Sequence, residues 1–121
     1  MSETVRILVV DDEESMQEFL QICFRREGHE VVTAGDVGSA LVALENDDFD
    51  VVISDIQMPD RSGLDLLREA RALAPDTVFI MITAFASTET AIEAMREGAY
   101  DYITKPFKVE EIRITIEKAL E

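Results

Sequence analysis

Short apolar runs alternate with helix-like segments along this chain, and that alternation limits its possible folds more than any other feature. Five of the runs resemble strands, and several are almost continuously apolar, as expected for a parallel sheet covered by helices on both faces. We expect these strands at Val5–Val10, Glu30–Ala34, Val51–Ser54, Val78–Ile82 and Tyr100–Thr104. The pattern therefore predicts an α/β fold.

A helix-like segment follows each of the five runs. In the first segment Met16, Leu20 and Phe24 repeat at the spacing that puts apolar side chains on one helix face. The expected helices are Glu14–Glu27, Val37–Glu45, Gly63–Leu73, Thr88–Glu97 and Val109–Leu120. Five β-α units joined by right-handed crossovers predict a doubly wound, five-stranded parallel sheet with five helices.

Residues near the helix ends support these boundaries. Gly28 and Gly98 stand just past the first and fourth predicted helices, where a left-handed backbone conformation is favourable only for glycine. Ser87 precedes the helix expected from Thr88, and its hydroxyl can accept a hydrogen bond from the first turn. We therefore expect positive φ angles at the two glycines and an N-cap at Ser87.

Length and composition are those of a single globular domain. The 121 residues are 47% hydrophobic and 31% charged, which suits one sizeable core. We expect one domain over residues 1–121, because the chain stops as the fifth predicted helix ends. There is no apolar run of ~18 residues that would cross a membrane, and the first residues lack the basic and apolar regions of a signal peptide.

Charge and cysteine content narrow the functional classes. The formal net charge of −15 argues against direct nucleic-acid binding, because the phosphate backbone requires clustered Lys and Arg. The single cysteine, Cys23, has no partner for an intrachain disulfide, which fits a reducing compartment. We expect a cytoplasmic protein that binds neither nucleic acid nor membrane through this domain.

Acidic residues follow two of the predicted strands. Asp11 and Asp12 come directly after the first strand, and Asp55 comes directly after the third. In open parallel sheets, ligands bind in the crevice beyond the carboxyl ends of the strands. Carboxylates gathered there repel one another unless a cation intervenes, and Mg²⁺ prefers such oxygen ligands. The sequence therefore predicts a magnesium site with a phosphoryl group beside it.

Asp55 is the candidate nucleophile of this site. A carboxylate can attack phosphorus and form an aspartyl phosphate, while a metal neutralises the charge on the phosphoryl oxygens. The backbone carbonyl of Gln57 is a further possible metal ligand. The loop from Met58 to Gly63 is rich in turn-forming residues, so a purely structural turn explains Pro59 and Gly63 equally well.

Three other candidate residues belong to the fourth and fifth predicted strands or directly follow them. Lys105 follows the fifth strand, and its amine can pair with Asp55 at rest and with a phosphoryl oxygen afterwards. Thr83 ends the fourth strand, where its hydroxyl either contacts the phosphoryl group or caps its own backbone. Tyr102, on the fifth strand, reads by itself as a half-buried packing residue.

Taken together, these residues resemble a known family over the full length of the chain: the receiver domain of two-component response regulators. The matching segments share the order and spacing of that family's signature, and they are Val9–Glu13, Ser54–Pro59, Gly63, Ile82–Ala84 and Asp101–Phe107. The resemblance implies a flavodoxin-like fold with strand order 2-1-3-4-5. It also implies a phosphorelay signal-transduction function rather than an enzyme acting on an external metabolite.

The resemblance assigns roles to the acidic residues. It implies that Asp55 is the phosphoacceptor, and that Asp11, Asp12 and Asp55 bind Mg²⁺ together with the carbonyl of Gln57. The phosphoryl donor would be a sensor histidine kinase or a phosphotransfer protein. The domain would catalyse only its own phosphorylation and dephosphorylation.

The resemblance also implies a conformational switch. Thr83 and Lys105 would contact the phosphoryl group, the Lys105–Pro106 bond would be cis, and Tyr102 would be the aromatic residue that rotates. Phosphorylation would shift the face formed by the fourth helix, the fifth strand and the fifth helix. Phe85, Ala86 and the helix from Thr88 would move. That face would control homodimerisation or an output domain.

The segments Thr83–Ala91 and Gly98–Tyr102 look most like receivers of nitrogen-regulation-type (NtrC-type) transcriptional activators. Those proteins carry an ATPase domain and a DNA-binding domain after the receiver, and neither lies within these residues. The resemblance therefore implies an output domain C-terminal to this chain and a role in transcription regulation. The alternative is a stand-alone single-domain response regulator or a phosphorelay intermediate.

Three other functions fit the residues less well. A phosphatase with an aspartyl nucleophile needs a second acid two residues after the first, where this chain has Gln57. A flavodoxin-like carrier needs a phosphate-binding loop after the first strand, and Asp11–Glu14 would repel phosphate there. A P-loop nucleotide switch needs GxxxxGK[ST], which this sequence lacks.

Overall fold

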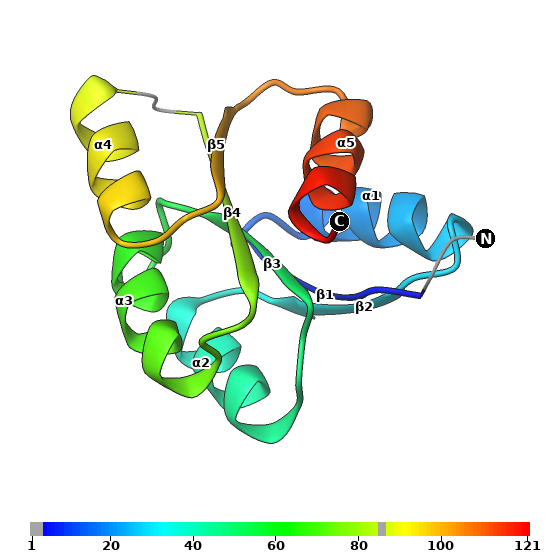
Figure 1. Cartoon of the computed structure of the whole chain (residues 1–121), viewed down its shortest axis with the longest axis horizontal. Coiled ribbons are helices and arrows are strands. Elements are labelled where there is room, and N and C mark those ends of the chain that lie inside the picture. The colour runs from blue at the N-terminus through cyan, green and yellow to red at the C-terminus, as the bar shows by residue number, and fades with distance from the viewer. Residues whose placement is uncertain (1–3, 85–86) are drawn as a thin grey trace.

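The computed structural model describes residues 4–84 and 87–121, and within them it contains a parallel sheet of five strands (Figure 1). The strand order is β2-β1-β3-β4-β5. The strands are β1 Arg6–Val10, β2 Glu30–Ala34, β3 Val51–Asp55, β4 Val78–Thr83 and β5 Asp101–Thr104. Every neighbouring pair is parallel. The predicted α/β fold class and strand order are confirmed.

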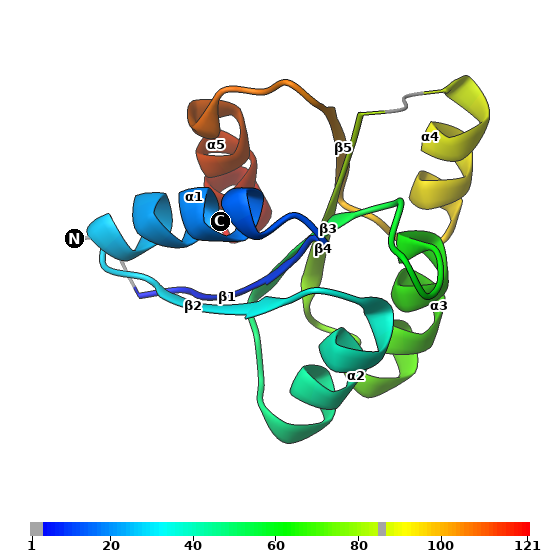
Figure 2. The ribbon, with the colours of Figure 1, turned by 180° about the vertical axis from the view of Figure 1, so that it is seen from behind.

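The helices form a layer on each face of the sheet. Helices α1 and α5 cover one face, and α2, α3 and α4 cover the other (Figures 1 and 2). Their bounds are α1 Glu14–Arg26, α2 Val37–Asn46, α3 Gly63–Leu73, α4 Thr88–Arg96 and α5 Val109–Ala119. Each begins where the sequence predicts and ends within one residue of its predicted end. None of the helices in the described ranges has the length and apolar character needed to cross a bilayer.

Two strands extend one residue further than the sequence predicts, and both differences fall at the candidate site. Asp55 is the last residue of β3, where it pairs with Ile82, and Thr83 is the last residue of β4, where it pairs with Thr104. The ladder continues past Asp55 because the backbone N–H of Ile56 donates to the carbonyl of Ile82 at 3.1 Å. Asp55 is therefore held by sheet hydrogen bonds rather than by a loop.

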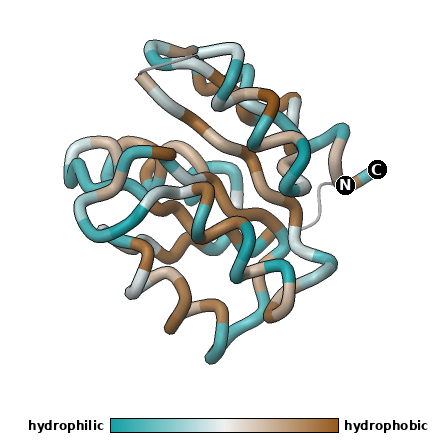
Figure 3. The backbone as a smooth tube through the Cα atoms, turned by 90° about the vertical axis from the view of Figure 1, so that its left-hand side faces the viewer, coloured by the Kyte–Doolittle hydropathy of each residue, from teal (hydrophilic) through white to brown (hydrophobic). Residues whose placement is uncertain are grey.

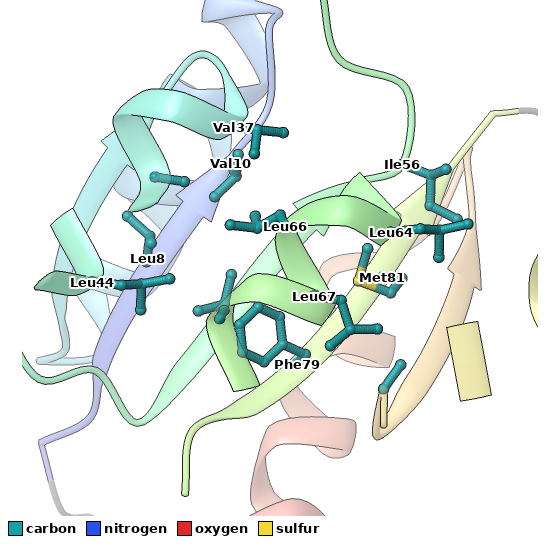
Figure 4. Close-up of a cluster of buried hydrophobic side chains, with 14 of the residues drawn as sticks. Leu8, Val10, Val37, Leu44, Ile56, Leu64, Leu66, Leu67, Phe79 and Met81 are labelled. Atoms are coloured by element: carbon teal, nitrogen blue, oxygen red, sulfur yellow. The ribbon is translucent and has the colours of Figure 1, made fainter. Parts of the chain in front are cut away.

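The core lies on both faces of the central strands. Successive strand side chains point to opposite faces, so Leu8 and Val10 pack under α2 and α3, whereas Ile7 and Val9 pack under α1 and α5. Figure 4 shows the first cluster, with Phe79 between the strands and α3. Hydrophobic residues follow the strands through the middle of the molecule (Figure 3). All four of these β1 side chains are fully buried, so β1 is covered on both faces of the sheet.

The predicted helix boundaries are confirmed at three positions. Gly28 has φ +89° and Gly98 has φ +104°, a backbone region that favours glycine. The hydroxyl of Ser87 accepts a hydrogen bond from the backbone N–H of Thr90 at 3.1 Å, so Ser87 is the N-cap of α4.

Candidate functional site

The sheet brings three carboxylates together at the carboxyl ends of its central strands. Asp11 follows β1 and is fully buried, Asp55 ends β3 and is 6% exposed, and Asp12 is exposed to solvent. Each of the three offers an oxygen within 4.8 Å of the others. Strands β1 and β3 are direct neighbours, with Val10 paired to Ser54. The register of the sheet thus enforces this crowding of negative charge.

One lysine offsets part of that charge. The ammonium nitrogen of Lys105 lies 2.9 Å from Oδ2 of Asp55 and 3.0 Å from Oδ2 of Asp11. It also lies 3.6 Å from Oε1 of Glu13. The remaining carboxylate oxygens accept backbone hydrogen bonds: Asp11 from the N–H of Glu13 at 2.9 Å, and Asp55 from the N–H of Gln57 at 3.1 Å. Each buried acid is therefore bonded on both oxygens.

The pKa shifts show that this compensation is incomplete. Burial raises the pKa of Asp11 above its ordinary value, although the N–H of Glu13 and the charge of Lys105 act against the rise. Burial alone would lower the pKa of Lys105, but its hydrogen bonds to Asp55 and Asp11 and their charges raise it overall. Lys105 therefore stays cationic, while Asp11 remains an acid whose ionised form is unfavourable.

The donor set fits a hard divalent cation. Three carboxylates face a single lysine, so negative charge is left over, and all the available ligand atoms are oxygens. Mg²⁺ needs only one or two carboxylates because it keeps several of its waters. A cavity of ≈ 380 Å³ opens beside the cluster, with Asp12, Asp55 and Lys105 in its wall. That volume holds a hydrated ion and a phosphoryl group, since a water takes about 30 Å³.

Gly63 fixes the loop that follows Asp55. A Cβ at this position would overlap the backbone carbonyl oxygen of Asp55, so only glycine allows α3 to start so close to the end of β3. The N–H of Gly63 donates to the carbonyl of Ile56 at 2.6 Å. Ser62 caps α3 by accepting from the N–H of Leu64 at 3.1 Å. The turn-forming residues of this loop therefore position the site rather than merely connecting two elements.

Gln57 and Thr83 lie at the edge of this cluster. Gln57 is exposed and lines the cavity. Thr83 is 1% exposed at the end of β4, and its carbonyl accepts from the N–H of Lys105 at 2.8 Å. The Lys105–Pro106 bond is cis, as the resemblance implied. Strands β4 and β5 thus deliver Thr83 and Lys105 to the same edge as the acids.

The structure places Tyr102 apart from the acidic cluster. Its ring is half-buried against the core under α4, and its hydroxyl lies 3.0 Å from Oγ1 of Thr90. The side chain is therefore directed toward α4 rather than toward Asp55. Phe85 and Ala86, which the resemblance names as moving residues, lie outside the described residues.

Two residues near the site were not predicted to have a part in it. Glu13 was not among the predicted site residues, yet its carboxylate lies 3.6 Å from the ammonium nitrogen of Lys105 and lines the cavity. Asp60, within the turn after Asp55, accepts from the N–H groups of Val37 and Gly38 at 3.0 Å each. The sequence carries a weak signal for Glu13, which adjoins Asp12, and none for Asp60, since an aspartate in a turn has many possible partners.

This combination of sheet order, clustered carboxylates and strand-end lysine is that of a receiver-type domain. The sequence matches the family "response regulator receiver domain" over residues 7–117, and the chain belongs to this family.

Relatives agree with this assignment. The chain is 38% identical to the transcriptional regulatory protein ZraR of Escherichia coli over 118 residues, which cover 98% of this chain and 27% of ZraR. It therefore spans about a quarter of that relative's length. The beryllofluoride-activated NtrC4 receiver domain dimer has a TM-score of 0.89 and 38% identity, covering 94% of each chain. The predicted likeness to nitrogen-regulation-type receivers is confirmed.

A further solved structure carries ligands. It is a response regulator protein from Burkholderia pseudomallei with a phosphorylated aspartic acid, a calcium ion and citrate. It has a TM-score of 0.89 and 31% identity to this chain, and the match covers 93% of this chain and 66% of that one.

Proposed function

We propose that this domain accepts a phosphoryl group on Asp55 and thereby switches a two-component signalling protein. The observation that carries the proposal is the position of Lys105 between Asp11 and Asp55, within a cluster of three carboxylate oxygens at most 4.8 Å apart. Membership of the receiver family supports the same reaction.

In the proposed transfer, a carboxylate oxygen of Asp55 attacks the phosphorus of a phosphohistidine on the donor. An O–P bond forms on Asp55, the N–P bond breaks, and the electron pair stays on the imidazole nitrogen, which takes a proton. Asp11, Asp12, Asp55 and the carbonyl of Gln57 would hold Mg²⁺, which supplies positive charge against the phosphoryl oxygens. The donor would be a sensor histidine kinase or a phosphotransfer protein.

Lys105 and Thr83 would act on the product. The ammonium group of Lys105 bonds to Asp55 at rest, and it would transfer this bond to a phosphoryl oxygen once Asp55 is modified. The hydroxyl of Thr83 would contact another phosphoryl oxygen. The domain would thus promote its own phosphorylation and dephosphorylation and turn over no external metabolite.

The output would pass through the face formed by α4, β5 and α5. Movement of Thr83 toward the phosphoryl group would leave space that the ring of Tyr102 fills, which biases the position of α4. This face would control homodimerisation or a C-terminal output domain that regulates transcription in the cytoplasm. The NtrC4 receiver supports a dimer as one outcome, because its activated form is described as one.

Intact mass measurement tests this proposal. Incubation with acetyl phosphate and Mg²⁺ should add one phosphoryl group that hydroxylamine removes, and Asp55→Asn should abolish the addition. Asp76→Asn is the control and should be modified like the wild type, because Asp76 is exposed and precedes β4, at the opposite end of that strand from Thr83. A hydroxylamine-stable phosphate, or modification that persists in Asp55→Asn, would exclude the aspartyl scheme.

A further inference from the structure

The two loops that carry the acidic residues both bond to the segment that runs from the last residue of β2 to the first turn of α2, Ala34–Gly38, which itself provides no residue to the site. The backbone N–H of Asp11 donates to the carbonyl of Ala34 at 3.0 Å. Asp60, in the loop after Asp55, accepts from the N–H groups of Val37 and Gly38 at 3.0 Å each. A single short segment thus serves as a common support for both loops.

The bonds to Asp60 are of a strong kind. The N–H groups of Val37 and Gly38 belong to the first turn of α2, where backbone donors have no partner within the helix. A carboxylate there gains charge-assisted hydrogen bonds and favourable interaction with the helix dipole. The same bonds, that from Val37 above all, lower the pKa of Asp60 and so favour its ionised form.

Capping α2 does not by itself explain Asp60. Helix α2 already has its own N-cap, because Asp36 accepts from the N–H of Ser39 at 2.7 Å. Asp60 comes from 22 to 23 residues away and adds a connection between two separate loops. Its own loop is anchored again at Gly63, which bonds to Ile56. The segment Gln57–Pro59 is therefore held at both ends.

We propose that Asp60 is a positioning residue for the acidic site: by tying the loop after Asp55 to the N-terminus of α2, it sets where Gln57 presents its backbone to a bound cation. This inference rests on the proposed function, because Gln57 is placed there as a metal ligand. Asp60 itself touches neither metal nor phosphoryl group. It acts through the loop, as residues behind metal ligands commonly do.

Calorimetric titration of Mg²⁺ into Asp60→Ala and Asp36→Ala separates positioning from helix capping. Both variants lose hydrogen bonds at the same end of α2, so both should unfold at lower urea concentration. Only Asp60→Ala should bind Mg²⁺ more weakly, by about tenfold, the lower end of the usual effect of residues behind metal ligands. Asp60→Asn keeps one acceptor oxygen and should fall between Asp60→Ala and the wild type.

The outcomes separate failure of the positioning role of Asp60 from failure of the proposed function. Equal Mg²⁺ affinity in the wild type, Asp60→Ala and Asp60→Asn would overturn the positioning role alone. Equal weakening in Asp60→Ala and Asp36→Ala would also overturn it, because the effect would then follow helix capping. A wild-type domain that takes up neither Mg²⁺ nor a phosphoryl group would overturn the proposed function and this inference together.

Discussion

The ammonium nitrogen of Lys105 lies 2.9 Å from Oδ2 of Asp55, although 50 residues separate them in the chain. Both side chains are largely buried, with exposed fractions of 11% and 9%. The contact satisfies a carboxylate that would otherwise stand uncompensated among two other acids. It also holds a cation where a modified Asp55 would present new negative charge. Stability at rest and the proposed response to phosphorylation would therefore depend on the same ion pair.

Removal of this lysine should cost stability as well as signalling. We expect Lys105→Ala to lower the free energy of unfolding without Mg²⁺ by about 3 kcal/mol, because two buried carboxylates lose their counter-ion. The variant should accept phosphate poorly and signal worse. Urea unfolding and activation-linked dimerisation measure the two effects, with the exposed Lys118→Ala as control. Dimerisation unchanged from the wild type would count against the assigned role.

Replacement of Asp11 should have opposite effects with and without metal. The ionised form of Asp11 is unfavourable in the fold because burial raises its pKa, so Asp11→Asn should unfold at a higher temperature than the wild type without Mg²⁺. The folded pKa lies above the unfolded value of 3.8. The gain in stability of Asp11→Asn over the wild type should therefore be complete above the folded pKa of Asp11 and vanish as the pH falls below 3.8.

Added Mg²⁺ should reverse the order of stability of the wild type and Asp11→Asn. The wild type should gain about 2.7 kcal/mol at a Mg²⁺ concentration a hundred times its Kd, whereas Asp11→Asn should gain little. Thermal unfolding with and without Mg²⁺ measures both effects. A variant that is less stable than the wild type without metal would contradict the assignment of Asp11 as an incompletely compensated acid.

The glycine at the start of α3 should not tolerate a side chain. Gly63→Ala would force a Cβ against the carbonyl oxygen of Asp55, and overpacking of this kind costs about 1–3 kcal/mol. Gly38→Ala is the matched control, because a Cβ there meets only ordinary contacts at 3.7 Å or more. That variant should be as stable as the wild type or gain up to about 1 kcal/mol from helix propensity. Equal unfolding midpoints for Gly63→Ala and the wild type would refute the packing argument.

Arg68 should restrain helix α4. Within Thr88–Arg96, which the structure describes completely, Ala94 alone is buried. Arg68 on α3 bonds to Glu93 of α4 and, at 3.2 Å, to Glu97 at the C-cap of α4. Arg68→Ala should speed hydrogen exchange of α4 amides while changing global stability little, since ion pairs of a solvent-exposed arginine contribute little to it. Arg61→Ala, which breaks a pair with Glu69 outside α4, is the control. Unchanged α4 exchange would show that other contacts hold this helix.

The sequence predicted the grouping of Asp11, Asp12, Asp55 and Lys105 because the carboxyl ends of parallel strands must meet at one edge. The alternation of apolar runs with helix-like segments was enough to predict the parallel sheet and therefore this grouping. The predicted strands β3 and β4 each ended one residue too early, because the continuation of a hydrogen-bond ladder depends on the neighbouring strand. For the same reason a local pattern does not reveal which oxygens Lys105 bonds.

Contacts between loops that are distant in the chain could not be predicted from the sequence. Asp60 looked like an ordinary turn residue, and its bonds to α2 arise only once β2 and β3 are placed on either side of β1. The hydroxyl contact of Tyr102 with Thr90 likewise depends on how α4 packs. Periodicity predicts which face of a strand is apolar, but not the partner that a polar group finds across the fold.

Titration calorimetry of Mg²⁺ into the unmodified wild-type domain tests the central claim most directly. The account predicts uptake of a single ion at the cluster of Asp11, Asp12 and Asp55, with binding lost or strongly weakened in Asp11→Asn and retained in Asp76→Asn. No detectable uptake by the wild type, or equal uptake by wild type and Asp11→Asn, would contradict it.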